Sequence, residues 1–154
     1  MANHAGGISI ITFIVAVAVS MGYYQFVYVP QANARPVLPE EIVNPPEVTN
    51  VQIVEGSALE SQTRNFVPKD ARAILGLSNK VVWTNNDGTS HTVTSDDGYH
   101  DQLSGAFAST EQLGALINPG ETFEFIFTKE GEYPYHCDPH PWMQATVVVV
   151  PNFA

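Results

Sequence analysis

The sequence contains one cysteine, Cys137, among its 154 residues. A single cysteine cannot form an internal disulfide, and it excludes any Cys-x-x-Cys motif and any cysteine-rich zinc module. Cys137 is therefore a buried bystander, a nucleophile or a metal ligand. A lone cysteine is most often the first of these, so its neighbours in the chain must decide.

Basic residues are also scarce. Six Lys and Arg stand against sixteen Asp and Glu, and the net charge is −10. Nucleic-acid binding needs a basic face, so we expect no nucleic-acid partner. The acidic surface either suits cationic partners or simply keeps the protein soluble.

Charge is absent altogether between Ala5 and Ala34. Within this stretch, Ile8 to Val29 form an apolar run of 22 residues. A helix of about 20 residues crosses the hydrocarbon core of a bilayer. We therefore expect residues 1–29 to form an N-terminal transmembrane anchor that contacts the membrane through residues 8–29.

A cleaved signal peptide is the alternative. Ala32-Asn33-Ala34 fits the A-x-A cleavage pattern. Against cleavage, the apolar run is longer than a typical signal core, and no Lys or Arg precedes it. The retained anchor is favoured, and a cleavage after Ala34 stays open. Its orientation is also open, because Arg35 is the only basic residue near either end.

Proline and glutamate dominate the next segment. Residues 30–49 hold five of the eleven prolines together with Glu40, Glu41 and Glu47. Such a composition favours an extended chain. We expect residues 30–49 to be a stalk.

Short β-strands follow, so we expect residues 50–154 to form an all-β domain. The strand candidates are residues 51–54, 80–85, 122–127 and 144–150, and turn residues separate them. In the third candidate, Phe123, Phe125 and Phe127 share one face and should point to the core. The pattern predicts an antiparallel sandwich, with one short helix beginning in a capping box at Ser109.

The stretch Y-P-Y-H-C-D-P-H-P-W-M, from Tyr133 to Met143, carries the candidate chemistry. Cys137, His140 and Met143 are spaced by three residues, so a tight loop can bring them to one point. His91, which follows a turn, is the best candidate for a second imidazole. Two imidazoles, a thiolate and a weak thioether form the ligand set of a blue-copper electron-transfer site. The soft ligands argue against calcium or magnesium, and a structural zinc would need a fourth strong ligand.

This stretch resembles the type I copper proteins, the cupredoxins, and is most similar to their amicyanin/plastocyanin branch. Further segments are similar in order and spacing between about Val51 and Val150: N-F-V-P from Asn65, V-W-T-N-N-D from Val82, S-H-T-V from Ser90, D-D-G from Asp96 and P-G-E-T-F from Pro119.

The resemblance implies a Greek-key β-sandwich with one type I copper held by His91, Cys137 and His140 and a long axial bond to Met143. It also implies that His140 is the ligand nearest to solvent. The function to expect is a membrane-tethered, single-pass electron carrier, with its copper domain on the extracytoplasmic side of the cell membrane. Its electron donor and acceptor would be redox proteins, membrane-bound complexes above all.

Residues around the ligands give further expectations. Thr92 and Asp138 follow His91 and Cys137, so a hydrogen bond between them would join the two ligand segments. Family members more often have Ser or Thr at position 138, and an Asp places a negative charge near copper. His136 should point away from the site, because neighbouring residues of a strand face opposite sides.

Three surface features are open to two interpretations. Trp142 either forms an apolar docking patch around His140 or is an ordinary half-buried aromatic. Asp96, Asp97 and Asp101 form an acidic recognition patch or are solvated turn residues. The extra segment between Tyr99 and Gly114 is a partner contact or an inert loop, and we favour the inert loop.

Two other functions compete with the carrier. A copper oxidase or reductase needs further copper, often held by His-x-His pairs, and this sequence has none. We therefore expect no enzymatic activity, except as an accessory copper subunit of a membrane oxidoreductase complex. A copper storage or delivery protein is the other candidate, and it would favour exposed, exchangeable ligands.

Overall fold

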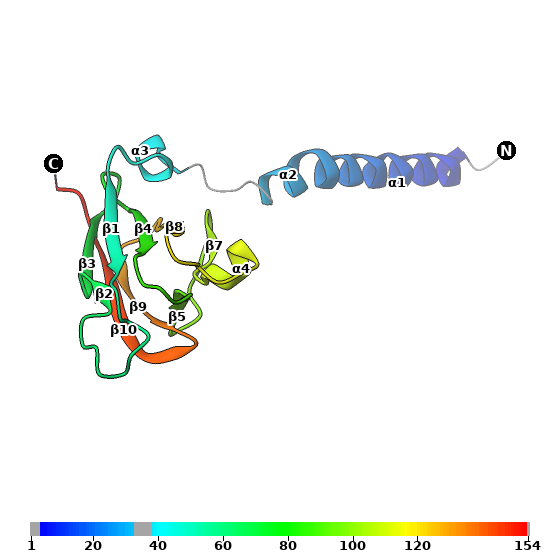
Figure 1. Ribbon diagram of the computed structural model, residues 1–154. Coiled ribbons are helices and arrows are strands. Elements are labelled where there is room, and N and C mark those ends of the chain that lie inside the picture. Colours follow the sequence, from blue (N-terminus) through cyan, green and yellow to red (C-terminus); the bar gives the residue numbers. More distant parts are fainter. Residues whose placement is uncertain (1–3, 33–37, 154) are drawn as a thin grey trace. The chain divides into compact units, whose positions relative to one another are not determined.

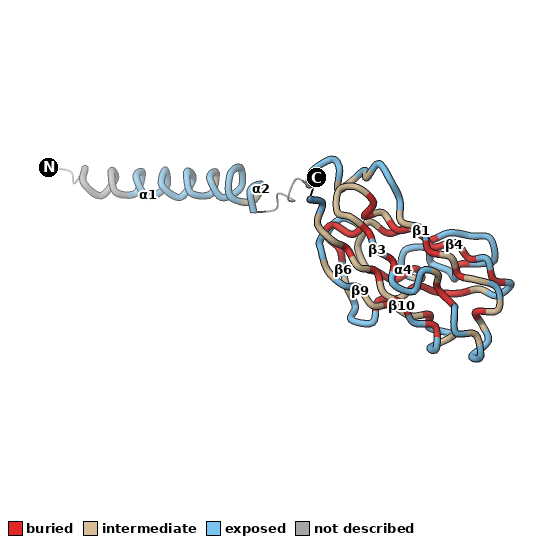
Figure 2. Tube along the Cα trace, turned by 90° about the vertical axis from the view of Figure 1, so that its left-hand side faces the viewer, coloured by how far each residue is buried: buried red, intermediate tan, exposed pale blue. Residues whose placement is uncertain are grey.

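The computed structural model describes residues 4–32 and 38–153 and divides the chain into two units, Met1–Val37 and Leu38–Ala154. The first unit is a helix built from α1 (His4–Tyr23), the π-helical turn η1 (Tyr24–Tyr28) and α2 (Val29–Ala32) (Figure 1). Its segment Ile10–Ala32 is long and apolar enough to cross a membrane. The described side chains of this segment are almost all exposed (Figure 2).

The helix continues past Pro30, where we expected it to end. A proline ring clashes with the carbonyl four residues earlier in a regular α-helix. The wider π turn η1 ends just before Pro30, and local π turns are one of the adjustments by which membrane helices tolerate proline. Two residues of the A-x-A pattern, Asn33 and Ala34, lie outside the described residues.

The second unit begins earlier than the proposed stalk ends. Glu40–Val43 form one helical turn, α3, instead of staying extended. The Nδ2 of Asn79 donates to the Ile42 carbonyl at 2.8 Å, and the Glu47 N–H donates to the Leu77 carbonyl at 3.0 Å. These bonds hold residues 42–47 on the β domain. The boundaries at 29/30 and 49/50 remain predictions.

Two four-stranded sheets form the β domain. The first has the order β2 (Phe66–Val67), β1 (Val48–Ile53), β4 (Lys80–Asn85) and β8 (Thr122–Ile126). The second has the order β3 (Asp70–Ile74), β10 (His140–Val150), β9 (Gly131–Cys137) and β5 (Thr94–Ser95). The pairs β1–β4 and β3–β10 are parallel, so the sandwich is mixed where the pattern predicted an antiparallel one. Both parallel pairs join strands that are not consecutive in the chain, so no local turn signal in the sequence reports their direction.

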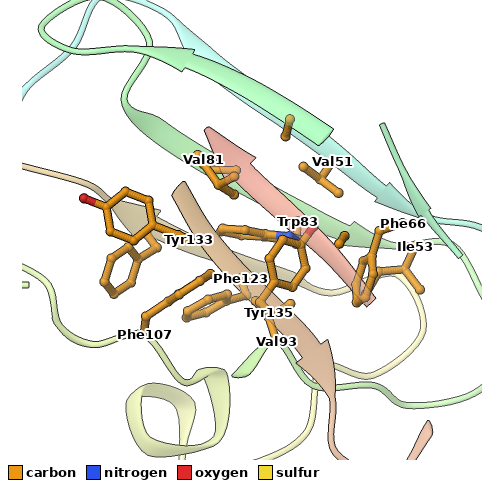
Figure 3. Close-up of a cluster of buried hydrophobic side chains, with 14 of the residues drawn as sticks. Val51, Ile53, Phe66, Val81, Trp83, Val93, Phe107, Phe123, Tyr133 and Tyr135 are labelled. Carbon is orange, nitrogen blue, oxygen red and sulfur yellow. The ribbon is translucent and has the colours of Figure 1, made fainter. Parts of the chain in front are cut away.

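An aromatic core joins the two sheets. Phe123, Phe125 and Phe127 are all buried, which confirms the core face predicted from their alternation. Trp83 of β4 and Tyr135 of β9 are fully buried and lie edge to face, with ring centroids 5.6 Å apart (Figure 3). Tyr135 precedes Cys137 by two residues on the same face of β9. The core therefore fixes the strand that carries the thiol.

The segment from Tyr99 to Gly114 is folded into the domain. It contains β6 (His100–Asp101), β7 (Gly105–Ala106) and the predicted short helix, α4 (Ser109–Leu113). Phe107 from this segment enters the core. The prediction of a capping box at Ser109 is wrong. Ser109 is the first helical residue and not the N-cap, and its hydroxyl accepts a hydrogen bond from the Val93 N–H. The segment thus supports the chain that follows His91.

Candidate metal centre

Three side chains from two distant parts of the chain meet at one end of the sandwich. The Sγ of Cys137 lies 3.6 Å from Nδ1 of His91 and 3.5 Å from Nδ1 of His140. The two Nδ1 atoms are 3.2 Å apart. Among the described residues, these three form the one group of His, Cys, Asp or Glu close enough to hold a metal ion.

The turn between β9 and β10 positions Cys137 and His140. The two residues are paired across a tight turn, Asp138-Pro139, so β10 begins at His140, earlier than the strand predicted at residues 144–150. The register then shifts between His140 and Gln144. Such a bulge re-aims side chains, and here it leaves Trp142 exposed while Met143 is fully buried.

His91 follows a turn, as the sequence indicated, and lies between the named strands. It forms an isolated bridge with Ile117, and backbone hydrogen bonds run in both directions between the two residues. Asn85 reinforces this arrangement, because its Nδ2 donates to the Ile117 and Thr89 carbonyls. His91 is fully buried, whereas His140 is half-buried. The structure therefore makes His140 the most accessible of the three.

A buried carboxylate contacts the far side of the His91 ring. The Nε2 of His91 lies 2.9 Å from Oδ2 of Asp87. A carboxylate accepts hydrogen bonds, so Nε2 carries the proton and Nδ1 keeps the lone pair that faces Cys137. Sequence reasoning missed Asp87, which stands in a turn-like Asn-Asp-Gly; its position four residues before His91 was the one available signal.

Burial and hydrogen bonding set the protonation of this pair. Burial lowers the pKa of His91, and the hydrogen bond to Asp87 opposes only part of that effect, so the ring is neutral and able to bind a metal. Burial alone would raise the pKa of Asp87, but hydrogen bonds from His91, Gly56, Ala58 and Gly88 lower it below its ordinary value. Asp87 is therefore ionised at neutral pH.

The thiol of Cys137 is enclosed. Burial raises its pKa, and hydrogen bonding by Thr92 opposes this. The backbone N–H of Thr92 lies 3.3 Å from Sγ and donates to it. A bound metal would replace the thiol proton. Pro139 has no N–H and adds no second donor.

Asp138 joins the two ligand segments as predicted. The Thr92 hydroxyl donates to Oδ2 of Asp138 at 3.0 Å, and the Asp138 N–H donates to the Thr92 hydroxyl oxygen at 2.8 Å. Thr94 adds a bond to the same carboxylate oxygen at 2.6 Å. Burial would raise the pKa of Asp138, but these hydroxyls and His136 lower it.

His136 lies on the outer face of β9, as expected. Its Nδ1 contacts Asp96, and its Nε2 lies 3.3 Å from Oδ1 of Asp138. Asp101, however, is not part of an acidic surface patch, because it is buried and accepts hydrogen bonds from Tyr99, Thr128, Leu103 and Ser104. The polar sequence around Asp101 does not indicate that this residue is buried.

Trp142 lies beside His140, with ring centroids 5.4 Å apart. Its Nε1 donates to the Ser57 carbonyl at 3.2 Å, and about a third of the residue stays exposed. The indole is therefore held in place and still offers an apolar surface next to the most accessible histidine.

The donor set fits copper. A buried sulfur and two imidazole nitrogens within 4.8 Å of one another match the three strong ligands of a type I site. No acidic oxygen lies in the group, as a hard cation would require.

Comparison with known proteins agrees with this chemistry. Residues 55–150, more than half of the chain, match the family described as copper binding proteins, plastocyanin/azurin family. Amicyanin from Paracoccus denitrificans is 29% identical over 73 residues, which cover 47% of this chain and 50% of amicyanin. The plastocyanin major isoform of Arabidopsis thaliana is 34% identical over 76 residues, which cover 49% of this chain and 44% of that protein. The chain thus spans about half the length of these curated relatives.

Solved structures share the fold. A purple cupredoxin from Nitrosopumilus maritimus superimposes with a TM-score of 0.53 at 29% identity, covering 66% of this chain and 99% of that chain. A copper-containing nitrite reductase from Thermus scotoductus SA-01 gives a TM-score of 0.52 at 22% identity, covering 78% of this chain and 28% of that chain. The second likeness shows that this fold also occurs as part of an enzyme.

Family, fold and donor set agree on copper as the cofactor, with His91, Cys137 and His140 close enough to form a type I site. Cupredoxins are generally single-electron carriers. The chain belongs to the plastocyanin/azurin family of copper-binding proteins.

Proposed function

We propose that the protein is a membrane-tethered electron carrier in which His91, Cys137, His140 and Met143 bind one type I copper ion. The observation that carries this proposal is the convergence of Sγ and two Nδ1 atoms within 4.8 Å, with the thiol and one imidazole fully buried. Met143 is buried within the bulge that follows His140, a position suited to a weak axial ligand.

The protein holds the ligands rigidly. Bound copper supplies a centre that alternates between Cu(II) and Cu(I). Asp87 fixes the His91 ring, and the Thr92–Asp138 bonds fix the loop that carries Cys137 and His140. Ligands held in this way move little between the two oxidation states. Small movement favours fast electron transfer.

Electrons enter or leave through His140. It is the most exposed ligand, and the Trp142 indole beside it provides an apolar contact surface. Redox partners then bind transiently through a small interface at this end, and the net charge of −10 attracts partners with basic surfaces to the protein as a whole.

The N-terminal helix tethers the carrier. The segment Ile10–Ala32 overlaps the predicted contact at residues 8–29, and its length and apolar composition suit a single membrane span. A tether restricts diffusion to the membrane plane and raises the local concentration near membrane-bound redox complexes. The copper domain then lies on the extracytoplasmic side of the cell membrane.

The competing function is copper storage or delivery. Delivery requires ligands that exchange, whereas His91 and Cys137 are fully buried and tied to Asp87 and Thr92. Burial of two of the three strong ligands favours the carrier.

Protein-film voltammetry of the copper-loaded full chain in detergent tests the proposal, together with transfer of copper to a chelator. We expect reversible one-electron cycling and slow loss of copper. His140→Ala should abolish reversible cycling, and His100→Ala, which removes an exposed histidine outside the site, should not. Rapid copper transfer without reversible cycling would contradict the carrier and support delivery.

A further inference from the structure

The Asp87 carboxylate accepts four hydrogen bonds, three of them from backbone N–H groups. Its Oδ1 accepts from the Gly56 N–H at 3.0 Å and from the Gly88 N–H at 2.8 Å. Its Oδ2 accepts from the Ala58 N–H at 3.1 Å and from His91 Nε2 at 2.9 Å. One buried carboxylate therefore connects a candidate copper ligand to a loop about 30 positions away.

The same loop also supports the other imidazole. Ser57, between Gly56 and Ala58, accepts the hydrogen bond from Trp142, whose ring lies against His140. Three consecutive residues, 56–58, thus contact the supports of both histidines. Displacing this loop would disturb both sides of the site together.

We infer that Asp87 is a positioning residue for copper, which fixes the tautomer and orientation of His91 and stabilises Cu(II) relative to Cu(I). The inference rests on the proposed function and adds a residue that acts on the metal through its ligand. Asp87 does not touch the metal position itself, because His91 lies between them.

The chemistry follows from the hydrogen bonds. A carboxylate that accepts the Nε2 proton fixes Nδ1 as the ligating atom and makes the imidazole a stronger donor. Its negative charge, in a place shielded from water, favours the higher positive charge of Cu(II). Both effects lower the midpoint potential.

Two substitutions separate charge from geometry. Asp87→Asn keeps an oxygen that can accept from Nε2 but removes the charge, and Asp87→Ala removes both. Asp101→Asn is the matched control, because Asp101 is an equally buried carboxylate with several hydrogen bonds but none to a copper ligand. Either Asn variant places an amide NH2 near backbone N–H donors, so both lose stability for the same reason.

The experiment compares the midpoint potential and Cu(II) affinity of the full chain and the three variants. We expect Asp87→Asn to bind Cu(II) about 10- to 100-fold more weakly, as is typical for partners of metal ligands. Cu(I) affinity should change less. The midpoint potential should therefore rise by about 59 mV for each tenfold fall in the ratio of Cu(II) affinity to Cu(I) affinity. Asp101→Asn should leave the midpoint potential and the Cu(II) affinity unchanged. Equal values for Asp87→Asn and wild type, or equal shifts in both Asn variants, would overturn the inference.

A second measurement needs no copper. In the metal-free full chain, ¹⁵N NMR should show His91 as the Nε2–H tautomer in wild type and a mixture of tautomers in Asp87→Ala. An unchanged tautomer in Asp87→Ala would overturn the positioning role. If wild-type protein fails to form a thiolate–copper site, the proposed function fails, whereas this tautomer result still decides the role of Asp87.

Discussion

The Nδ1 atoms of His91 and His140 lie 3.2 Å apart, although 49 positions separate the two residues in the chain. Neither ring turns its Nδ1 toward a hydrogen-bonding carboxylate, and Nε2 of His91 donates a hydrogen bond to Asp87. Two lone pairs and a sulfur that face one point make a site for a soft cation.

Met143→Leu should raise the midpoint potential and preserve the visible thiolate–copper band. Leucine conserves the buried volume, so the stability cost should stay below about 1.5 kcal/mol. Loss of the thioether removes a weak donor that stabilises Cu(II), and the axial ligand tunes the potential. Voltammetry checks this, with Met21→Leu in the N-terminal helix as control. Equal midpoints for Met143→Leu and wild type would exclude Met143 as a ligand.

Asp138→Thr should also raise the midpoint potential. The substitution removes a negative charge next to Cys137 and supplies a hydroxyl that can bond to Thr92 in place of the carboxylate. Because the Asp138 side chain is about half exposed, solvent reduces the effect, and we expect a rise on the order of tens of millivolts, less than the tenfold equivalent of about 59 mV. Asp97→Thr, which removes a charge from an exposed turn, is the matched control. An unchanged or lower midpoint would refute this role of the charge.

Asp101→Asn should destabilise the β domain at neutral pH by about 1–3 kcal/mol, the cost of leaving buried donors without a proper acceptor. Burial alone would raise the pKa of Asp101, but hydrogen bonds from Thr128, Leu103 and Tyr99 lower it. A carboxylate with a lowered pKa stabilises the fold above its unfolded pKa, about 3.9, and loses this contribution as pH falls through the folded value.

Urea denaturation of wild type and Asp101→Asn across pH checks this account. The difference in unfolding free energy should be constant between pH 5 and 7 and shrink as the solution becomes more acidic than about pH 4. A difference that grows toward low pH would mean that the Asp101 carboxylate is not charged in the fold.

The strand faces and the ligand spacing were predictable because they are local patterns. Alternation of Phe123, Phe125 and Phe127 has the period of a strand, and the structure buries all three. The three-residue spacing of Cys137 and His140 suits a tight turn, and the structure pairs them across one. His91 was predicted because it follows a turn, and the family resemblance, with its order of motifs, implied the same residue.

The missed features depend on contacts between distant segments. Asp87 accepts hydrogen bonds from the N–H groups of Gly56 and Ala58, and Asp101 accepts two from Thr128. In the sequence, both aspartates stand in polar, turn-like surroundings that normally indicate solvent exposure. Which aspartate is buried is decided by the topology that brings those donors to it.

The N-terminal segment should be retained in the mature protein. Intact mass of the protein expressed in a host that processes signal peptides should include residues 1–34, and a chain beginning at Arg35 would show cleavage instead. A retained segment also predicts that the protein is recovered in the membrane fraction. Val19→Lys, near the middle of the apolar helix, should reduce membrane recovery, since Lys costs about 2.5–3.5 kcal/mol at a helix centre. Val48→Lys, an exposed apolar residue of β1, should not.

Visible and EPR spectroscopy of the copper-loaded full chain, alongside Cys137→Ala, tests the central claim most directly. We predict an intense visible thiolate-to-Cu(II) band and a type I EPR signal in wild type and in the His100→Ala control. Both signals should be absent in Cys137→Ala. A wild type without the band, or a band that survives in Cys137→Ala, would contradict the assignment of Cys137 as a copper ligand and, with it, the electron-carrier function.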